Sequence, residues 1–174
     1  MCVMSGFNKV FEIGPVFRAE NATTHRHLCE FTGLDFEMVI KENYMEILEF
    51  AGELFGYIFK GLEERFKKEL EAVHEQYPFE PFKFKSNIPK LTFEEGCELL
   101  KKAGVEQSPL EDLCTENERK LGTIIKEKYE TDFYMLHKFP TSARPFYTMP
   151  CPKNPEYSNS YDFFMRGEEI VSGA

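Results

Sequence analysis

The sequence predicts an α+β fold with a largely antiparallel sheet, and two observations lead to this prediction. Segments rich in Val, Ile, Phe and Thr, which is typical of strands, occur near both ends of the 174-residue chain. Between them, apolar residues recur at spacings of three and four, the period of amphipathic helices. The strands therefore gather before and after the helices instead of alternating with them, which favours antiparallel pairing over βαβ units.

The first predicted element is a long β-hairpin over residues 8–20 and 28–39, with a polar turn from Asn21 to His27. Because strand side chains alternate between faces, each strand has one mostly apolar face and one face that mixes charges with occasional apolar groups. An ordinary amphipathic hairpin gives the same alternation. Periodicity alone therefore favours a plain solvent-facing surface for the charged face.

One long helix is predicted next. Asn43 and Glu46 match a capping box, in which an N-cap side chain is answered by Glu three residues later. A single apolar stripe then runs over residues 47–73, and Pro78 marks the point by which the helix has ended. Residues 78–90 contain three prolines and are expected to form a surface connector.

Two shorter helices complete the helical segment. The second helix is predicted to start with a capping box at Thr92 and Glu95 and to end at Gly104, a residue suited to the position just past a helix. The third is predicted to start with Thr115 and Glu118. The loop between them contains a proline.

Strands are predicted again in the last part of the chain. Residues 131–139, 158–166 and 167–173 have strand composition, and the last two are expected to be joined by a tight turn near Gly167.

Composition excludes several functional classes. The formal net charge of −9 argues against nonspecific DNA binding, which needs a dense basic face. There is no run of about 18 apolar residues, so no membrane span is expected, and the N-terminal residues lack the pattern of a secretory signal. The five cysteines lack the close spacing of a zinc site and are expected to be free thiols in a reducing compartment: Cys2, Cys29, Cys97, Cys114 and Cys151.

The density of reactive groups around the hairpin turn is unusual. Five groups fall within fourteen residues: Arg18, Glu20, Arg26, His27 and Phe31. Two guanidinium groups and an imidazole suit a polyphosphate, because Arg forks onto phosphate oxygens through charge-assisted hydrogen bonds. An aromatic face beside them suits stacking of a base. Asp35 and Glu37, further along, suit a cation or an ammonium group.

At this point the residues resemble a known family. Phe-Arg-Ala-Glu-Asn at 17–21, Thr-His-Arg-His-Leu at 24–28 and Glu-Phe-Thr-Gly-Leu-Asp at 30–35 are similar to motif 2 of the class II aminoacyl-tRNA synthetases. Arg-Pro-Phe-Tyr-Thr-Met-Pro at 144–150 and the run at 157–174 resemble the stretch before motif 3 in aspartyl-tRNA synthetases of the eukaryotic cytosolic type. The resemblance covers essentially the whole chain, and the two ends are its most specific parts.

The resemblance implies a role for each matching residue. It implies that Arg18 contacts the ATP α-phosphate and the aspartate carboxylate, that Arg26 and His27 hold the outer phosphates, and that Phe31 stacks on adenine. It assigns Glu20 to the adenosine or the tRNA end, and Asp35 to the aspartate ammonium group. Ala19 and Leu28 belong to the implied ATP-binding set. Glu169 and Ser172 are the implied Mg²⁺ ligands, and Ser172 also the implied aspartate contact.

The two implied magnesium ligands raise a geometric question. Glu169 and Ser172 are three residues apart, so strict alternation puts them on opposite faces of a strand. If both reach one ion, the strand is expected to be irregular there, as at a β-bulge, or one contact runs through water or backbone.

The resemblance also implies a domain organisation. Residues 1–174 match part of a catalytic domain, divided into the motif 2 hairpin (1–40), a helical segment (41–130) and further strands of the catalytic sheet (131–174). The family parts before motif 2 and from motif 3 onward have no counterpart in this sequence, so the expected fold is an incomplete synthetase-like sheet flanked by helices. The chain alone is expected to be inactive.

The implied function is aspartate–tRNA ligation in the cytoplasm, with L-aspartate, ATP, Mg²⁺ and tRNA(Asp) as reaction partners and a homodimeric full-length enzyme. Two alternatives stay open. An asparaginyl-tRNA synthetase shares Phe-Arg-Ala-Glu and Arg-His-Leu, although the Gly33–Asp35 run and residues 157–164 argue against it. A non-catalytic binding module that keeps the synthetase fold is the other alternative.

Overall fold

The computed structural model describes residues 1–21 and 27–174, and the chain divides into two compact units, Met1–Ile47 and Leu48–Ala174. Within the described residues, no helix combines the length and the apolar character that crossing a membrane requires.

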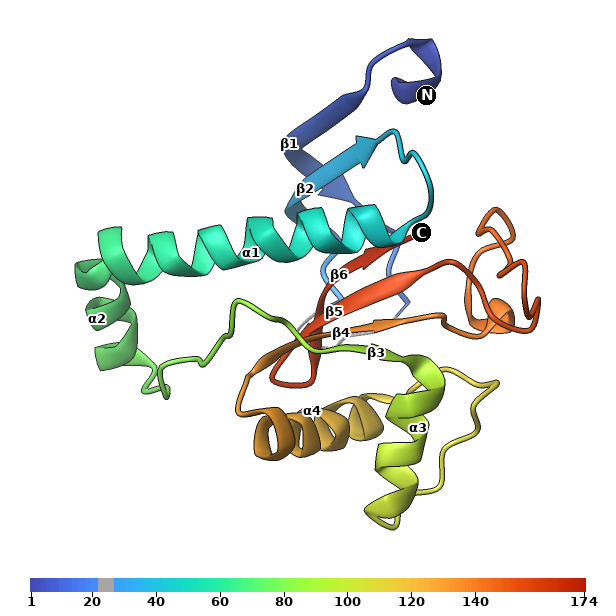
Figure 1. Cartoon of the computed structure of the whole chain (residues 1–174). Helices are drawn as coiled ribbons and strands as arrows, with labels where there is room; N and C mark the ends of the chain where they lie inside the picture. Colours follow the sequence, from blue (N-terminus) through green and yellow to red (C-terminus); the bar gives the residue numbers. More distant parts are fainter. Residues whose placement is uncertain (22–26) are drawn as a thin grey trace. The chain divides into compact units, whose positions relative to one another are not determined.

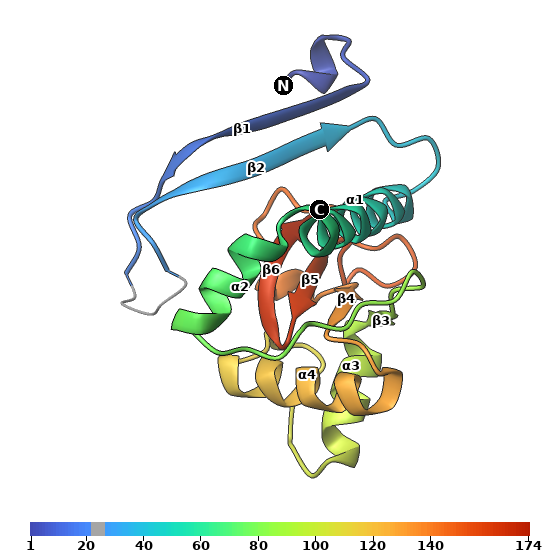
Figure 2. The same cartoon turned by 90° about the vertical axis from the view of Figure 1, so that its left-hand side faces the viewer.

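The first unit is a β-hairpin preceded by a short 3-10 helix, η1 (Val3–Ser5). β1 (Lys9–Phe17) and β2 (Glu30–Met38) pair antiparallel along their full length, as Figure 2 shows. Phe11 lies opposite Phe36 on one face, and Glu12 lies opposite Asp35 on the other. The register therefore confirms both the predicted hairpin and its division into an apolar face and a charged face.

The predicted single long helix is wrong, because two helices occupy its place. α1 (Met45–Arg65) and α2 (Lys67–Gln76) are separated at Phe66, whose φ of −119° and ψ of 34° lie outside the helical range. Phe66 is neither Pro nor Gly, so the sequence contains no breaker that would reveal this interruption.

Half of the first predicted capping box is present. The Glu46 carboxylate accepts hydrogen bonds from the backbone N–H groups of Glu42 (2.7 Å) and Asn43 (3.4 Å). The Asn43 side chain, however, accepts from the Met45 amide at 2.9 Å, so it closes a tight local turn before the helix instead of capping the Glu46 amide.

The predicted capping box of α3 (Phe93–Lys102) is confirmed in full. The Thr92 hydroxyl accepts from the Glu95 amide at 3.2 Å, and the Glu95 carboxylate accepts from the Thr92 amide at 2.7 Å. The helix ends at Lys102, and Gly104, the glycine predicted to lie just past its end, has a φ of +79°, which suits glycine. α4 (Thr115–Tyr129) begins at the predicted residue, although Cys114 is its N-cap.

The second unit contains a four-stranded sheet in the order β3-β4-β5-β6. Its strands are β3 (Lys90–Thr92), β4 (Phe133–His137), β5 (Tyr161–Met165) and β6 (Glu168–Gly173). β3 pairs parallel with β4, and the other two pairings are antiparallel. The largely antiparallel sheet is therefore confirmed, while β3, at the end of the expected connector, was not predicted.

A two-residue turn joins β5 to β6, as predicted. Arg166 and Gly167 both have positive φ (53° and 75°), the conformation of a type I′ hairpin turn. The turn lies against α4, because a Cβ atom added to Gly122 would be only 2.5 Å from the Gly167 nitrogen. Two glycines thus permit a close approach between the turn and a helix.

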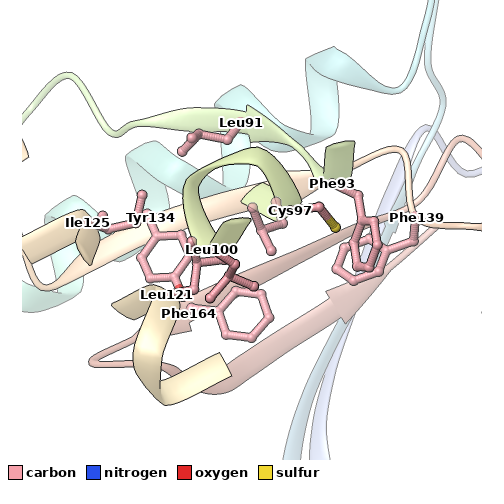
Figure 3. Close-up of a cluster of buried hydrophobic side chains, with 10 residues drawn as sticks. Leu91, Phe93, Cys97, Leu100, Leu121, Ile125, Tyr134, Phe139 and Phe164 are labelled. Carbon is pink, nitrogen blue, oxygen red and sulfur yellow. The ribbon is translucent and has the colours of Figure 1, made fainter. Parts of the chain in front are cut away.

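Helices cover both faces of this sheet, as Figure 1 shows. On one face, α1 places Phe55 and Phe59 against Phe133, with ring centroids 5.5 and 5.1 Å apart. On the other face, α3 and α4 cover a buried cluster that includes Tyr134 and Phe164 (Figure 3). Neighbouring residues on β4 and β5 are buried on opposite faces, so these strands are almost continuously apolar.

Candidate functional site

The structure brings three of the predicted site residues together at the turn end of the β1–β2 hairpin. The Arg18 amide donates to the Cys29 carbonyl at 2.9 Å, which extends the strand pairing beyond β1. The Arg18 guanidinium carbon lies 5.2 Å from the centroid of the Phe31 ring, and its Nη1 lies 4.0 Å from Glu20 Oε1. Because 63% of the Arg18 side chain is exposed, the guanidinium is open to an anionic ligand.

The charged face of the hairpin continues from this group toward Asp35. Phe31, Gly33 and Asp35 share this face of the hairpin. Phe31 and Asp35 are four residues apart on an extended strand, so their Cα atoms are separated by about 13 Å. Gly14 lies directly opposite Gly33, so neither residue adds a side chain between the aromatic and the acidic ends, and Val16 Cγ2 leans over Gly33, 2.8 Å from the position that a Cβ would take. Glu12 lies opposite Asp35, and such a like-charge pair is unfavourable unless a cation offsets it.

A cavity of about 350 Å³ lies at the acidic end of this face, and Glu12, Asp35 and Glu37 are among its lining residues. The face thus offers a cation and an aromatic ring at one end, carboxylates at the other, and a pair of glycines between them. This arrangement suits an elongated ligand with a base, an anionic group and an ammonium group.

The remaining predicted residues of the hairpin are placed less specifically. Ala19 and Leu28 are exposed, and His27 is half-buried. Arg26 lies outside the described residues, so its predicted phosphate contact stays a prediction.

The irregularity expected between Glu169 and Ser172 is present. Phe164 lies opposite Glu169, whereas the preceding residue, Phe163, lies opposite Val171, so Ile170 is an extra residue in β6. Asp162 and Phe164 are two apart on β5 and share a face, and their partners, Ser172 and Glu169, consequently share it too. Both Glu169 and Ser172 are exposed.

A third residue of this group, the acidic Asp162, was missed by the sequence analysis. Asp162 lies directly opposite Ser172, and its Oδ2 lies 2.6 Å from Nη2 of Arg144. Its side chain is only 5% exposed, and this burial raises the pKa of the Asp162 carboxyl, while the Arg144 guanidinium and, to a smaller extent, the Ser172 side chain act in the opposite direction. Oδ1 of Asp162 has no hydrogen-bond partner among the described residues.

The signal for Asp162 is visible in hindsight. It is an acidic residue within a strand, Tyr161–Met165, that is otherwise apolar and largely buried. A carboxylate in that setting has either a structural partner or a ligand.

The three side chains fit a magnesium ion by their chemistry. Asp162 and Glu169 contribute carboxylate oxygens and Ser172 a hydroxyl oxygen, the hard ligands that Mg²⁺ prefers, and one buried oxygen is left unsatisfied. The hairpin group and this group lie in different units.

Sequence comparison matches the whole chain to one family. Residues 1–174 match the model of the class II tRNA synthetases (D, K and N). The chain is 60% identical to the cytoplasmic aspartate–tRNA ligase 2 of Arabidopsis thaliana and 55% identical to the cytoplasmic aspartate–tRNA ligase of Homo sapiens, in each case over all 174 residues. These alignments cover 31% and 35% of the relatives, so the chain spans about a third of their length.

Solved structures agree with this assignment and bear on the asparaginyl alternative. The aspartyl-tRNA synthetase of Entamoeba histolytica matches 99% of the chain and 36% of its own length, with a TM-score of 0.95 and 51% identity. The asparaginyl-tRNA synthetase of Pyrococcus horikoshii, solved with asparaginyl-adenylate, matches 98% of the chain and 38% of its own length, with a TM-score of 0.77 and 26% identity. The closer likeness is to the aspartyl enzyme, and the predicted synthetase-like α+β fold is confirmed. The chain therefore belongs to the class II tRNA synthetases of the D, K and N group.

Proposed function

We propose that this chain is part of the catalytic domain of an aspartate–tRNA ligase, which activates L-aspartate with ATP and transfers it to tRNA(Asp). The observation that supports this most strongly is the grouping of Arg18, Glu20 and Phe31 at the end of the hairpin. It occurs in a chain that is 55% to 60% identical to cytoplasmic aspartate–tRNA ligases.

The hairpin is the proposed binding surface for ATP. Phe31 stacks on the adenine, and Arg18 binds the α-phosphate through its exposed guanidinium. Arg26 and His27 bind the outer phosphates, and Glu20 orients the adenosine or the tRNA end. The backbone around Ala19 and Leu28 completes the proposed ATP contacts.

Aspartate is proposed to bind next to the α-phosphate. Its carboxylate pairs with Arg18 and its ammonium group with Asp35, while Ser172 supplies a hydroxyl contact. The like-charge pair of Asp35 and Glu12 supports this assignment, because an ammonium ion relieves the repulsion between two opposed carboxylates.

Glu169 and Ser172 are proposed to hold Mg²⁺, with Asp162 as a further oxygen ligand. Bound there, the ion would offset the negative charge of the phosphates. The shared face of Glu169 and Ser172 and the unsatisfied Oδ1 of Asp162 support the assignment.

The proposed reaction has two steps and needs no protein nucleophile. An oxygen of the aspartate carboxylate attacks the α-phosphorus of ATP, and the bond to pyrophosphate breaks, giving aspartyl-adenylate. A ribose hydroxyl at the tRNA end then attacks the activated carbonyl, and AMP leaves. The protein contributes alignment and charge neutralisation, mainly through Arg18.

The full-length protein is proposed to be a cytoplasmic homodimer, as the family resemblance implies. The chain alone is proposed to be inactive, because it spans about a third of the relatives' length and so leaves the catalytic domain incomplete.

The test is aspartate-dependent exchange of pyrophosphate into ATP. It compares the isolated chain with a chimera in which the chain replaces the matching residues of the human relative, to which it is 55% identical. The chimera is expected to exchange with aspartate and not with asparagine, and Arg18→Ala to reduce its rate by about 100-fold or more. The isolated chain is expected to give no exchange.

Absence of exchange in the chimera, while the human enzyme is active in the same assay, would favour the alternative of a non-catalytic binding module. Exchange that requires asparagine would favour the asparaginyl alternative.

A further inference from the structure

Arg144 connects the two strands that bear the proposed magnesium ligands. Its Nη2 lies 2.6 Å from Asp162 Oδ2 on β5, and its Nη1 donates to Ser172 Oγ on β6 at 3.4 Å. Asp162 and Ser172 are cross-strand partners, so a single guanidinium contacts both members of one pair. This bridge is formed by side chains and is additional to the backbone pairing of β5 and β6.

The guanidinium is held in place by the core. Its Cζ lies 3.9 Å from the centroid of the Phe139 ring, and that ring packs against Phe93 with centroids 4.9 Å apart. The backbone just before Arg144 is anchored by Thr141, whose hydroxyl donates to the Pro155 carbonyl at 2.8 Å. Because its side chain is only 13% exposed, Arg144 lacks the freedom of a surface arginine.

The contacts of Arg144 determine which oxygens of Asp162 and Ser172 remain available to a ligand. Asp162 Oδ2 is engaged by Arg144, so the carboxylate cannot turn freely, and Oδ1 is the atom without a partner in the described part of the chain. A buried carboxylate without its counter-charge would be strongly disfavoured. Nη1 also donates to Ser172 Oγ at 3.4 Å, so the same guanidinium contacts this hydroxyl.

We infer that Arg144 is a positioning residue that fixes Asp162 Oδ1 and Ser172 Oγ on the face of the sheet that also carries Glu169. The inference rests on the proposed function, because that function assigns these oxygens to Mg²⁺ and aspartate. Arg144 is not itself among the proposed ligands of Mg²⁺ or aspartate and acts through the two side chains that it bridges. Such supporting partners typically change metal affinity or activity by about 10–100-fold when removed.

An ion pair between α4 and β6 provides a matched control. Arg119 on α4 lies 2.9 Å from Glu168, at the opposite end of β6 from Ser172. Its side chain is 56% exposed, and its loss removes an arginine and an ion pair to β6 without touching the Asp162–Ser172 pair. A general weakening of β6 would appear in both variants, whereas a positioning effect would appear only at Arg144.

The experiment uses the chimera described above with three substitutions: Arg144→Met, Arg144→Lys and Arg119→Met. Two quantities are measured for each, the Mg²⁺ concentration that gives half-maximal exchange and the hydrogen–deuterium exchange of the amides in residues 169–173. Arg144→Met should raise the Mg²⁺ requirement about 10–100-fold and accelerate amide exchange at residues 169–173. Arg119→Met should leave the Mg²⁺ requirement and the amides near Ser172 unchanged.

Arg144→Lys separates charge from geometry. Lysine can pair with Asp162 but lacks the fork that reaches Asp162 and Ser172 together, so the Mg²⁺ requirement should stay raised although the protein folds normally. A wild-type Mg²⁺ requirement in either Arg144 variant would overturn the inference, as would an equal rise in Arg119→Met.

Failure of the proposed function is distinguished by the parent chimera, which would then show no exchange. In that event hydrogen–deuterium exchange of the amides in residues 169–173 tests the role of Arg144. Loss of protection in Arg144→Met but not in Arg119→Met supports the bridging role, and unchanged protection in Arg144→Met overturns it.

Discussion

Glu169 and Ser172 lie on the same face of β6 although they are three residues apart, because Ile170, between them on β6, is an extra residue with no partner on β5. A regular strand would place the two side chains on opposite faces. The bulge therefore allows the Glu169 carboxylate and the Ser172 hydroxyl to bind one ligand. It also implies that Glu169 and its neighbour Glu168 have different roles.

This separation predicts different effects for two adjacent carboxylates. In the chimera, Glu169→Gln should lower the rate of aspartate-dependent pyrophosphate exchange by about 100-fold, the size expected for loss of a charged group that stabilises the transition state. Glu168→Gln should change it less than about threefold, because Glu168 pairs with the largely exposed Arg119. Equal losses in the two variants would show that the bulge does not assign these roles.

Asp132 is predicted to be a main source of stability in the second unit. Its carboxylate accepts from the Lys83 amide at 2.8 Å and forms ion pairs with Lys126 and Arg166, each at 3.2 Å. Asp132→Asn removes a buried charge from between two cations, and at pH 7 it should lower the free energy of unfolding by about 3 kcal/mol. Urea denaturation of the isolated chain measures this change.

The effect of Asp132→Asn should depend on pH in a defined direction. Burial acts to raise the pKa of Asp132, but the Lys83 amide, Lys126 and Arg166 outweigh it, so the folded-state pKa lies below the ordinary value of 3.8. The stabilisation is therefore present above pH 3.8 and is lost as the pH falls through the folded-state pKa. A difference between variant and wild type that stays constant down to pH 2 would contradict this account.

The close approach of α4 to the β5–β6 turn predicts a steric effect at Gly122. Gly122→Ala would place a methyl group 2.5 Å from the Gly167 nitrogen, and the turn would have to move, at a cost of about 1–3 kcal/mol. Gly61→Ala in α1 is the matched control, because its added methyl group would meet no described atom within 4 Å. The control should stabilise the chain by about 0.5–1 kcal/mol, as alanine is the better helix former. Thermal unfolding of both variants tests the opposite signs.

The capping box of α3 predicts a local effect at Thr92. Thr92→Ala removes the acceptor of the Glu95 amide, which should lower the free energy of unfolding by about 1 kcal/mol. Glu98→Ala, at an exposed position within the same helix, should change it by less than about 0.5 kcal/mol. If the two substitutions have equal effects, the cap contributes no more than an ordinary surface position.

The elements that the sequence determined are those governed by neighbouring residues. The two hairpin faces follow from alternation, the start and end of α3 from Thr92, Glu95 and Gly104, and the tight turn from Gly167. The motif around Arg18 also lies in a short stretch, so the sequence alone is enough to name the proposed ATP residues of the hairpin. In each case the physical cause acts over a few residues, and the sequence contains all of it.

Tertiary structure decided what depends on residues far apart in the chain. β3 is a strand because residues 90–92 pair with β4, more than forty residues later in the chain. Which β6 side chains share a face of the sheet depends on the register of β6 with β5. The bridge from Arg144 to Asp162 and Ser172 likewise joins side chains 18 and 28 residues apart. No local pattern specifies these contacts, because burial, register and the pairing of charges depend on the folded surroundings of each residue.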